Sequence, residues 1–328
     1  MRVLFSTRHH AMDRNPYLRQ LEMHLSDQDV SVRPWAWRTA LLGRYDVLHV
    51  HWPEYIVTHR RPHIAAVNAV LSYLLLVRLQ LVGTPVVWTV HNEQPHFTVN
   101  RGARRRLRWL NRLVVERIQL HDAPPAENQT LILHGDYQDW YAQYPQYSPR
   151  SGRILFFGLI RAYKNVPALI AAFASLPGAD LTLRVVGEPD DDSLRDELVR
   201  SAARDDRVHL ILGFASEADL AAEISSASLV VLPYSHVFNS GAALLALSLG
   251  RPILVASSDS MQSLGHEVGD GWVLTYDGAL APDQLTSALA IAESRPDERP
   301  RLDDRSWTHG ASLHKQVYRH ALGPTSAA

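Results

Sequence analysis

The chain has 328 residues, of which 46% are hydrophobic, enough to bury large cores and to form two domains. It contains no cysteine, which excludes disulfide bonds, thiol nucleophiles and cysteine-ligated zinc and fits a reducing compartment. The formal net charge is −1, yet residues 1–150 carry 18 arginines against 12 acidic residues, whereas residues 151–328 carry 15 basic residues against 22 acidic ones. The chain therefore has a basic first half and an acidic second half.

The first ten residues, MRVLFSTRHH, lead directly into a predicted strand and show no signal-peptide pattern, so we expect a cytoplasmic protein. The longest apolar run covers residues 64–82 and is interrupted by Asn68, Arg78 and Gln80. Because a membrane span needs about 20 mostly apolar residues, these interruptions favour a buried helix over a span.

In the first half, runs of apolar and β-branched residues predict strands at residues 3–6, 30–36, 46–51, 86–90 and 131–133. Helical periodicity predicts helices between them, at residues 15–26, 62–82 and 102–121. Strands that alternate with helices are typical of a parallel α/β sheet covered on both faces, with ligands at the carboxyl ends of the strands.

Histidines are frequent at these carboxyl ends. His9 and His10 follow the first predicted strand, His49 and His51 end the third, and His91 follows the fourth. His49 and His51 share one face of their strand because side chains alternate with period two. No HExxH or comparable spacing is present, so we expect no metal site. A polar site for a hydroxyl-rich substrate is the better interpretation.

Glu54 and His91 are the preferred acid/base candidates because each lies just past the end of a predicted strand. Asp13, Glu93 and Asp122 are further candidates. For each of these residues, a surface or capping role is the alternative. Trp52 is either a platform for stacking a sugar or a core residue, and the core role is favoured.

The basic segment 101–117, RGARRRLRWLNRLVVER, begins at Arg101 and ends at Arg117. An apolar face can form on this predicted helix with arginines beside it, from Leu107, Leu110, Leu113, Val114 and Ile118. A basic amphipathic helix suits an anionic membrane surface or an acidic partner. The alternative is a solvated helix whose apolar stripe packs on the core.

Residues 137–152, YQDWYAQYPQYSPRSG, have two prolines, clustered tyrosines and no helical period, which predicts an interdomain linker. The second half then predicts strands at residues 154–157, 181–186 and 208–212 and a helix at residues 166–175. A glycine follows each of these three strands, at Gly158, Gly187 and Gly213.

The segment from Leu229 to Ala256 predicts a strand ending at Pro233, a polar loop, a helix at residues 242–249 and a second strand, which together form a βαβ crossover. The loop ends with Asn239, Ser240 and Gly241 at the carboxyl edge of the sheet, where free N–H groups and the helix dipole favour an anion. Asn239 or Ser240 would cap the helix, and Gly241 would admit a ligand. An ordinary capped core helix is the alternative.

Arg161 and Lys164 are one turn apart after Gly158, so they could clamp a diphosphate that Gly187 and Gly241 admit. No GxGxxG follows a predicted strand, and no GxxxxGK[ST] is present. These absences argue against a nicotinamide cofactor and against a P-loop.

Several segments of the second half resemble the C-terminal nucleotide-sugar domain of the GT-B glycosyltransferases, closest to the family 4-like group. They are FGLIRAYK (157–164), VVGEP (185–189), LGF (212–214), SASLVVLPY (226–234) and ALSLGRPILVA (246–256). The last helical segment, RSWTHGASLHKQVYRHAL (305–322), resembles the closing helix of that family. LHVHWPE (48–54) and WTVHN (88–92) resemble acceptor-side motifs of bacterial members that build polysaccharides.

The resemblance implies a GT-B fold of two Rossmann-like parallel-sheet domains that face a cleft. Residues 1–145 would bind the acceptor, residues 146–305 would bind the nucleotide sugar, and residues 306–328 would form a closing helix and tail that pack back on the first domain. Such enzymes generally need no metal or other cofactor, because cationic side chains and a helix terminus neutralise the leaving diphosphate.

The resemblance also assigns roles to residues of this chain. Arg161 and Lys164 would bind the donor diphosphate, together with backbone N–H groups of Ser240 and Gly241. The donor cleft would be bordered by Gly158, Gly187 and Asn239. His91 matches a family histidine near the reacting sugar, and the other acceptor-side residues would be His9, His51, Trp52 and Asn92.

Two departures place the chain in a divergent bacterial branch. Many members carry two glutamates eight residues apart near the organising helix, whereas this chain has Val237 and Leu245 at those positions. The glycine pair that usually follows the first strand is replaced by residues 7–10, TRHH. The nucleotide base and the stereochemical outcome therefore stay open, and an inverting enzyme would use Glu54 as its general base.

The resemblance implies transfer of a hexose from a nucleoside-diphosphate sugar, GDP-mannose or UDP-hexose, to a hydroxyl of a glycan or lipid-linked acceptor in polysaccharide or glycoconjugate biosynthesis. The enzyme would be cytoplasmic and peripheral on the inner face of the plasma membrane, and we expect no nucleic-acid partner. Two alternatives are a sugar-nucleotide epimerase of the same architecture and a degenerate, non-catalytic subunit that binds nucleotide sugars.

Overall fold

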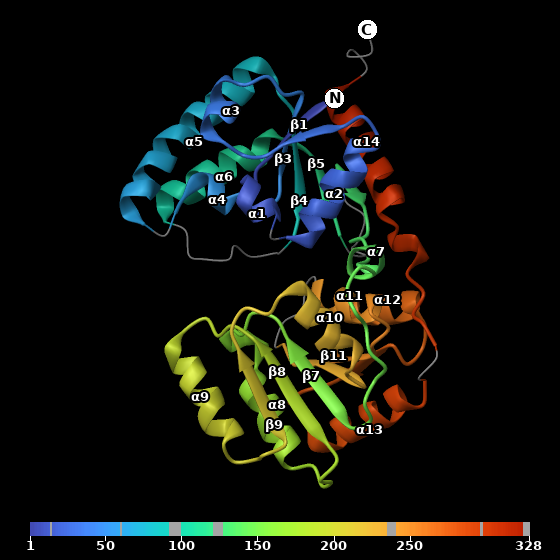
Figure 1. Ribbon diagram of the computed structural model, residues 1–328. Helices are drawn as coiled ribbons and strands as arrows, with labels where there is room; N and C mark the ends of the chain where they lie inside the picture. Colours follow the sequence, from blue (N-terminus) through green and yellow to red (C-terminus); the bar gives the residue numbers. More distant parts are fainter. Residues whose placement is uncertain are drawn as a thin grey trace. The chain divides into compact units, whose positions relative to one another are not determined.

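The computed structural model describes residues 1–13, 15–59, 61–91, 100–120, 127–234, 241–295 and 298–323. The chain divides into two compact units, each with its own sheet (Figure 1). Unit 1 comprises Met1–Gly135 together with Asp304–Ala328, and unit 2 comprises Asp136–Asp303. The parallel α/β architecture predicted from the sequence is confirmed in both units.

Unit 1 contains a six-stranded parallel sheet in the order β2-β1-β3-β4-β5-β6. Its strands are β1 (Arg2–Phe5), β2 (Ser31–Arg33), β3 (Val47–Val50), β4 (Val86–Val90), β5 (Val114–Gln119) and β6 (Gln129–Leu131). Its helices are α1 (His9–Asp13), α2 (Pro16–Ser26), α3 (Trp37–Leu42), α4 (Glu54–Val57), α5 (Pro62–Val82), α6 (Arg101–Leu113) and α14 (Trp307–Leu322). The strand order reverses between β1 and β3, the position at which such sheets bind ligands.

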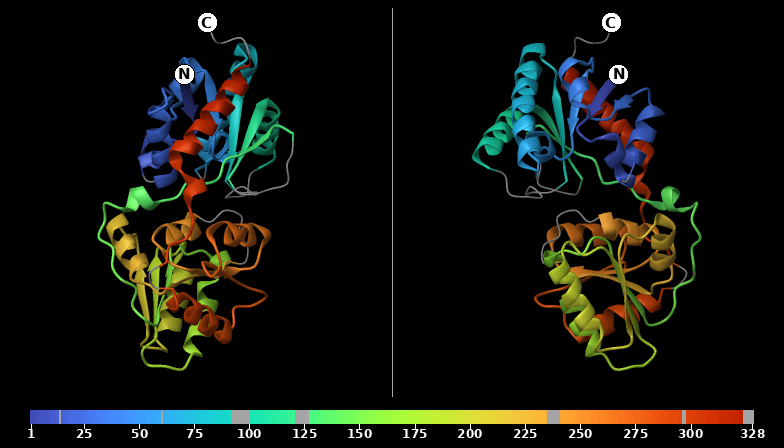
Figure 2. Two further views of the ribbon diagram at one scale, coloured as in Figure 1. Left: turned by 90° about the vertical axis from the view of Figure 1, so that its right-hand side faces the viewer. Right: turned by 60° about the vertical axis from the view of Figure 1, so that its left-hand side comes forward.

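The alternation of side chains along the strands separates two cores in unit 1. Val3 and Phe5 of β1 pack toward α2 and α14, whereas Leu4 packs toward the core that contains residues of α3, α4, α5 and α6. Figure 2 shows α14 lying along the sheet beside α2. The last helix thus belongs to unit 1, as the resemblance implied.

Unit 2 has a second six-stranded parallel sheet, in the order β12-β11-β10-β7-β8-β9. Its strands are β7 (Arg153–Phe157), β8 (Thr182–Gly187), β9 (Val208–Leu212), β10 (Leu229–Leu232), β11 (Ile253–Ala256) and β12 (Val273–Tyr276). Its α-helices are α7 (Gln138–Tyr141), α8 (Val166–Ala174), α9 (Asp192–Ala202), α10 (Glu217–Ser225), α11 (Gly241–Ser248), α12 (Asp259–Val268) and α13 (Pro282–Glu293). Two 3₁₀ helices are η1 (Ala162–Lys164) and η2 (Asp303–Arg305).

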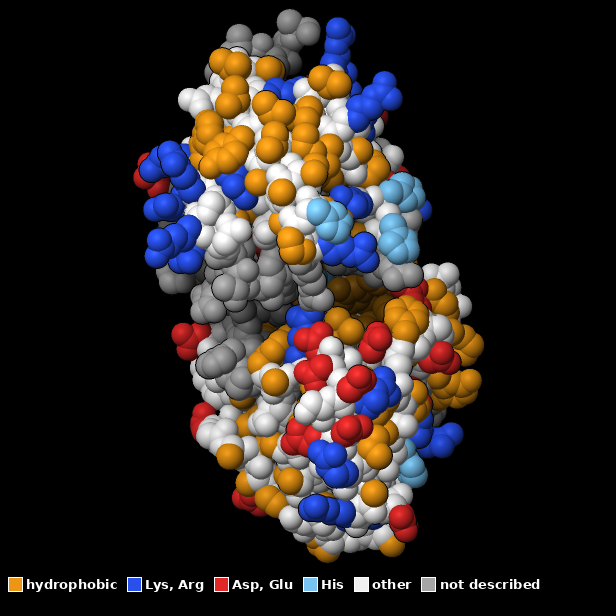
Figure 3. All heavy atoms as spheres, turned by 90° about the vertical axis from the view of Figure 1, so that its left-hand side faces the viewer, with side chains coloured by type: hydrophobic (Ala, Val, Ile, Leu, Met, Phe, Trp, Pro, Cys, Tyr) orange, Lys and Arg blue, Asp and Glu red, His pale blue; other side chains and the backbone are white. Residues whose placement is uncertain are grey.

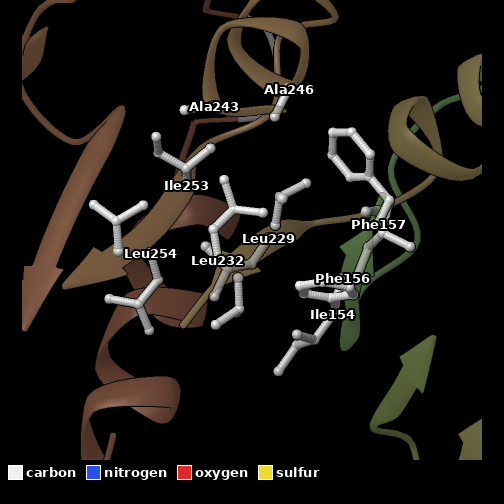
Figure 4. Close-up of a cluster of buried hydrophobic side chains, with 14 of the residues drawn as sticks. Ile154, Phe156, Phe157, Leu229, Leu232, Ala243, Ala246, Ile253 and Leu254 are labelled. Atoms are coloured by element: carbon white, nitrogen blue, oxygen red, sulfur yellow. The ribbon is translucent and has the colours of Figure 1, made fainter. Parts of the chain in front are cut away.

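The predicted crossover β10-α11-β11 is confirmed, since β10 and β11 pair in parallel at the centre of unit 2. In Figure 4, apolar side chains of β7, β10 and β11 gather in one core beside α11. Ala243 and Ala246 face this core, and their small side chains let the helix approach the sheet closely. The strand order of unit 2 reverses between β7 and β10.

Two sequence predictions in unit 1 are wrong. The helix predicted over residues 102–121 ends at Leu113, and β5 begins at Val114 because β-branched Val114 and Val115 favour a strand. The helix at residues 62–82 forms, but it is not buried, since only 28% of its most apolar stretch is buried. Among the described residues, α5 is the one helix long and apolar enough to cross a membrane, which by itself is weak support for a span.

The segment expected to be a linker is partly structured. Tyr137 and Tyr141 pack into the core of unit 2, and the Tyr137 N–H donates to the Ser248 hydroxyl at 2.9 Å. Unit 2 therefore begins at Asp136 and ends at Asp303, whereas we expected boundaries at residues 145 and 305.

Two strand-end glycines of unit 2 give a matched test of close packing. An added Cβ at Gly187 would overlap the carbonyl oxygen of Gly158, whereas one at Gly213 would meet nothing within 4 Å. We expect Gly187→Ala to lower the free energy of unfolding of unit 2 by about 3 kcal/mol, because backbone must move. Gly213→Ala should change it by less than about 0.5 kcal/mol. Urea unfolding followed by circular dichroism measures both, and equal stabilities would contradict the close approach of β7 and β8.

Candidate active site

The carboxyl ends of β1 and β3 are joined at the reversal point of unit 1. The Ser6 N–H donates to the His49 carbonyl at 2.9 Å, and the His51 N–H donates to the Ser6 hydroxyl at 3.0 Å. These bonds hold the end of β3 beside the end of β1. Side chains that follow either strand therefore project from the same edge of the sheet.

His49 is a buried connector between β3, β4 and α14. Its Nε2 lies 2.7 Å from the Thr89 hydroxyl, and its Nδ1 lies 2.7 Å from the Tyr318 hydroxyl. Burial, with lesser effects of the His314 and His91 imidazoles, holds the pKa of His49 well below its usual range. A neutral imidazole donates through one nitrogen and accepts through the other, so both bonds can form at once.

His51 lies beside His49, with ring centroids 4.2 Å apart, which confirms that the two share a face. Burial, followed by the neighbouring His49, also holds the pKa of His51 well below its usual range. Its Nδ1 lies 3.0 Å from Nε2 of His91. Among the described residues, its Nε2 has no hydrogen-bond partner. His51 thus contacts His91 from the interior of unit 1, and the His51 side chain is not exposed to solvent.

His91 is the half-buried member of this group. Its ring stacks on Trp52, with centroids 4.4 Å apart and planes inclined by 20°. Trp52 itself is partly buried against the core of unit 1. His51 and Trp52 therefore fix the orientation of the His91 ring from two sides. We call His49, His51, Trp52 and His91 the histidine cluster.

Glu54 is buried at the start of α4, two residues after Trp52. Its carboxyl group therefore lies beside the carboxyl end of β3. His9 lies in α1 and is exposed. The structure thus brings His51, Trp52 and His91 into contact.

Some predicted site residues lie outside the described part of the chain. These are Asn92, Glu93, Asp122, Asn239 and Ser240, and the side chain of Asp13 is also outside it. Of the two positions where family glutamates are missing, Val237 is likewise outside, and Leu245 is buried in α11.

In unit 2, Arg161 and Lys164 follow β7 at the reversal point. The Lys164 ammonium lies 4.8 Å from the ring centroid of Tyr234, which follows β10, and 5.9 Å from that of Phe156. Burial, with a lesser effect of Arg161, lowers the pKa of Lys164 to about 8. Among the described residues, neither cation has an acidic partner within salt-bridge distance. We call Arg161 and Lys164 the cation pair.

Gly158 lies beside the cation pair. Gly158 has a φ of +105°, and a Cβ there would lie 3.6 Å from the Lys164 nitrogen. The Gly158 N–H donates to the Val186 carbonyl at 2.9 Å, so this turn lies against the end of β8. A small anion can therefore approach both cations and nearby backbone without meeting a side chain at Gly158.

Gly241 is the first residue of α11, where backbone N–H groups have no partner within the helix. A Cβ at Gly241 would lie 3.4 Å from the Tyr137 hydroxyl. Sequence reasoning missed both Tyr137 and Tyr234. Tyr234 lies two residues after the buried strand β10, a position that could have identified it. Tyr137 lies in a segment interpreted as a linker and gave no signal.

No group of three or more His, Asp or Glu side chains that could hold a metal ion occurs in the described part of the chain. Polar groups gather near the two strand reversals. Neutral imidazoles suit sugar hydroxyl groups, and two cations without an acidic partner among the described residues suit a diphosphate.

Known proteins that resemble the chain are glycosyl transferases. The model of the family described as "Glycosyl transferases group 1" matches residues 151–293. A GDP-mannose:glycolipid 4-beta-D-mannosyltransferase of Xanthomonas campestris pv. campestris is 41% identical over 326 residues, covering 98% of this chain and 93% of the relative. This match favours a transferase over an epimerase.

Solved structures of low sequence identity share the fold. Anabaena HepE in complex with UDP has a TM-score of 0.63 at 15% identity, over 97% of this chain and 96% of HepE. Sucrose-phosphate synthase from Thermosynechococcus elongatus has a TM-score of 0.65 at 15% identity, over 98% of both chains. Given the 41% identity to the Xanthomonas enzyme over nearly all of its length, the chain belongs to the group 1 glycosyl transferases and is a GT-B hexosyltransferase that moves a sugar from a nucleotide-sugar donor to a hydroxyl of a glycan or lipid-linked acceptor.

Proposed function

We propose that the chain transfers mannose from GDP-mannose to a hydroxyl group of a lipid-linked saccharide, without a metal ion, at the cytoplasmic face of the plasma membrane. The choice of sugar and acceptor rests on the printed activity of the 41% identical Xanthomonas relative. The observation that carries the donor chemistry is the cation pair, two cations without an acidic partner among the described residues. UDP-hexose is the second donor to be tested.

The cation pair would bind the diphosphate of the donor. A partly buried ammonium without a counter-ion among the described residues is destabilised, and a bound diphosphate would supply the opposite charge. The N-terminus of α11 at Gly241, with Ser240 before it, would add backbone N–H donors, while Gly158, Gly187 and Asn239 would border the donor. These groups would neutralise the charge that grows on the departing GDP, a task that a metal ion performs in metal-dependent enzymes.

Glu54 would act as general base. The relative is named for a β-linked product, and formation of a β-linkage from an α-linked donor requires inversion at the anomeric carbon. In a direct displacement, the acceptor oxygen attacks that carbon as its proton moves to the Glu54 carboxylate. The bond from carbon to phosphate oxygen breaks, and GDP leaves with its charge held by the cation pair.

The histidine cluster and the acceptor-side residues would position the acceptor. His91, stacked on Trp52 and held by His51, presents one half-buried imidazole of defined orientation that can bind a sugar hydroxyl. His51, whose Nδ1 lies 3.0 Å from Nε2 of His91, would act by holding the His91 ring. His9 and Asn92 would complete this side.

The first experiment measures donor and acceptor together. We expect GDP, in the presence of EDTA, to raise the thermal midpoint more than UDP, ADP or TDP, since a ligand at a hundred times its Kd stabilises the fold by about 2.7 kcal/mol. Radiolabelled GDP-mannose should then transfer label to lipid-linked saccharides extracted from Xanthomonas campestris membranes. Conversion of GDP-mannose without acceptor would instead identify an epimerase, and binding without turnover would identify a non-catalytic subunit.

Glu54→Gln tests the general base. Because glutamine keeps the shape of the side chain but cannot accept the proton, kcat should fall about 100-fold to 10,000-fold, while the GDP-induced thermal shift stays unchanged. Glu22→Gln, on α2 of the same unit, is the matched control and should retain wild-type turnover. Turnover of Glu54→Gln within a few-fold of wild type would remove Glu54 from the mechanism.

The lowered pKa of Lys164 predicts a pH dependence of donor binding. Below pH 8 the ammonium is charged before GDP arrives, whereas above pH 8 binding must first take up a proton. GDP affinity should therefore fall by up to about tenfold between pH 8 and pH 9. Without GDP, the stability of the fold changes with pH in the opposite direction from GDP affinity. Above pH 8 Lys164 is protonated in the unfolded chain but largely deprotonated in the folded one, so its contribution to the free energy of unfolding rises with pH until the ordinary lysine pKa of 10.5 is reached.

Lys164→Met should weaken GDP binding about 10-fold to 100-fold at pH 7, the cost of losing one charged hydrogen bond, and should remove this pH dependence. Lys315, the second of the two lysines in the chain, donates to the Gln28 carbonyl in unit 1 and supplies the control Lys315→Met. A calorimetric titration of GDP across this pH range compares the three proteins. If Lys164→Met kept the wild-type pH profile, Lys164 would not contact the diphosphate.

A further inference from the structure

Helix α5 carries apolar residues on its outward side as well as on its inward side. Its inward residues include Asn68 and Ser72, which are buried. The Asn68 side chain accepts from the Trp37 indole N–H and donates to the Thr58 carbonyl, both at 3.3 Å. Leu75, Leu76 and Leu79 also face inward and belong to the core of unit 1. Polar bonds and apolar packing together fix which side of α5 faces outward.

The outward side of α5 is an apolar stripe. Its members are spaced three and four residues apart, so they lie along one face of the helix: Val67, Val70, Leu74, Val77 and Leu81. Their side chains are between 43% and 81% exposed. Figure 3 shows this face of unit 1 as a broad band of hydrophobic side chains. We call these five residues the α5 stripe.

Arginines of α6 flank the α5 stripe. Helix α6 packs beside α5. Tyr73 of α5 has the Arg106 guanidinium 5.2 Å from its ring centroid and the ring centroid of Trp109 6.2 Å from it, both on α6. The exposed arginines of α6 are Arg101, Arg104, Arg105, Arg108 and Arg112. Between Glu54 and Glu116 the sequence has nine arginines and one acidic residue, Glu93. Figure 3 shows basic side chains gathered beside the hydrophobic band.

We propose that the α5 stripe and the exposed arginines of α6 form a docking surface for an anionic lipid bilayer, with α5 lying in the plane of the interface. An apolar face beside clustered arginines matches the acyl boundary and the anionic headgroups of such a bilayer. The biological purpose rests on the proposed lipid-linked acceptor, whereas the docking itself does not. The basic segment at residues 101–117 thus supplies charge, and α5 supplies the apolar contact.

Charge and packing disfavour other coverings of the α5 stripe. A second copy bound through this surface would bring two arginine-rich helices together, since a two-fold interface uses the same patch on both chains. Crossing the bilayer would require α5 to leave the core, which would break the bonds of Asn68 and expose Leu75, Leu76 and Leu79. A lipid surface requires neither rearrangement.

Vesicle flotation of the full chain, without donor or acceptor, tests the proposal. Wild-type protein should float with vesicles of phosphatidylcholine and phosphatidylglycerol in equal parts, and less with phosphatidylcholine alone. The double variant Leu74→Gln and Leu81→Gln should lower the partition coefficient about 100-fold, about tenfold for each leucine that no longer inserts. Arg105→Gln with Arg108→Gln should lower binding to the anionic vesicles by about fivefold for each arginine, and should leave binding to phosphatidylcholine vesicles unchanged.

The matched control is Val199→Gln with Ile291→Gln, on exposed positions of α9 and α13 in unit 2, which should float like wild type. Circular dichroism and the thermal midpoint confirm that every variant is folded. The proposal is overturned if wild type does not float, if the leucine variant floats equally well, or if that variant only converts a dimer into monomers. Since no sugar nucleotide is present, a wrong donor assignment would leave this outcome unaffected.

Discussion

The reversal of strand order beside the first strand of each sheet is the constraint on which both groups of polar residues depend. In unit 1 the reversal lies between β1 and β3, and in unit 2 it lies between β7 and β10. Helices leave such neighbouring strands toward opposite faces of the sheet, so the strand ends stay uncovered by their own connections. The histidine cluster lies beside the first of these places and the cation pair beside the second. Parallel pairing brings His91, after β4, to the histidines of β3, and brings Tyr234, after β10, to Lys164, after β7.

Burial then gives the two places opposite chemistry. In unit 1, burial keeps the pKa values of His49 and His51 low, so both imidazoles are neutral and need no counter-ion. His49 can therefore form a hydrogen bond to Tyr318 and so connect β3 to α14. In unit 2, the same effect acts on a lysine, and the result is a cation that gains from meeting an anion. One place is therefore suited to neutral hydroxyl groups and the other to a diphosphate, the two polar partners of a nucleotide-sugar transfer.

Strand periodicity and composition predicted much of this arrangement. The pairing of β10 with β11 and the shared face of His49 and His51 follow from local pattern alone. The contact of His51 with His91 could not be derived so directly, because it depends on the register of β3 against β4. The end of α6 was missed because Leu107, Leu110 and Leu113 continue a helical pattern into Val114, where β-branching and sheet pairing prevail. Tyr137 was missed because its ring packs into a core built from distant segments, and its N–H donates to Ser248, more than a hundred residues away.

Helix α5 shows that apolar composition does not determine which side of a helix is buried. Its sequence is apolar all round, so the inward side is chosen by the few polar side chains that find partners there, Asn68 above all. In water the α5 stripe is therefore exposed, and it adds nothing to folding stability. At a lipid surface the same stripe would confine the enzyme to two dimensions and would raise the effective concentration of the proposed lipid-linked acceptor. Docking would thereby raise the rate at which the enzyme meets its acceptor, although the α5 stripe itself does not contact the reacting atoms.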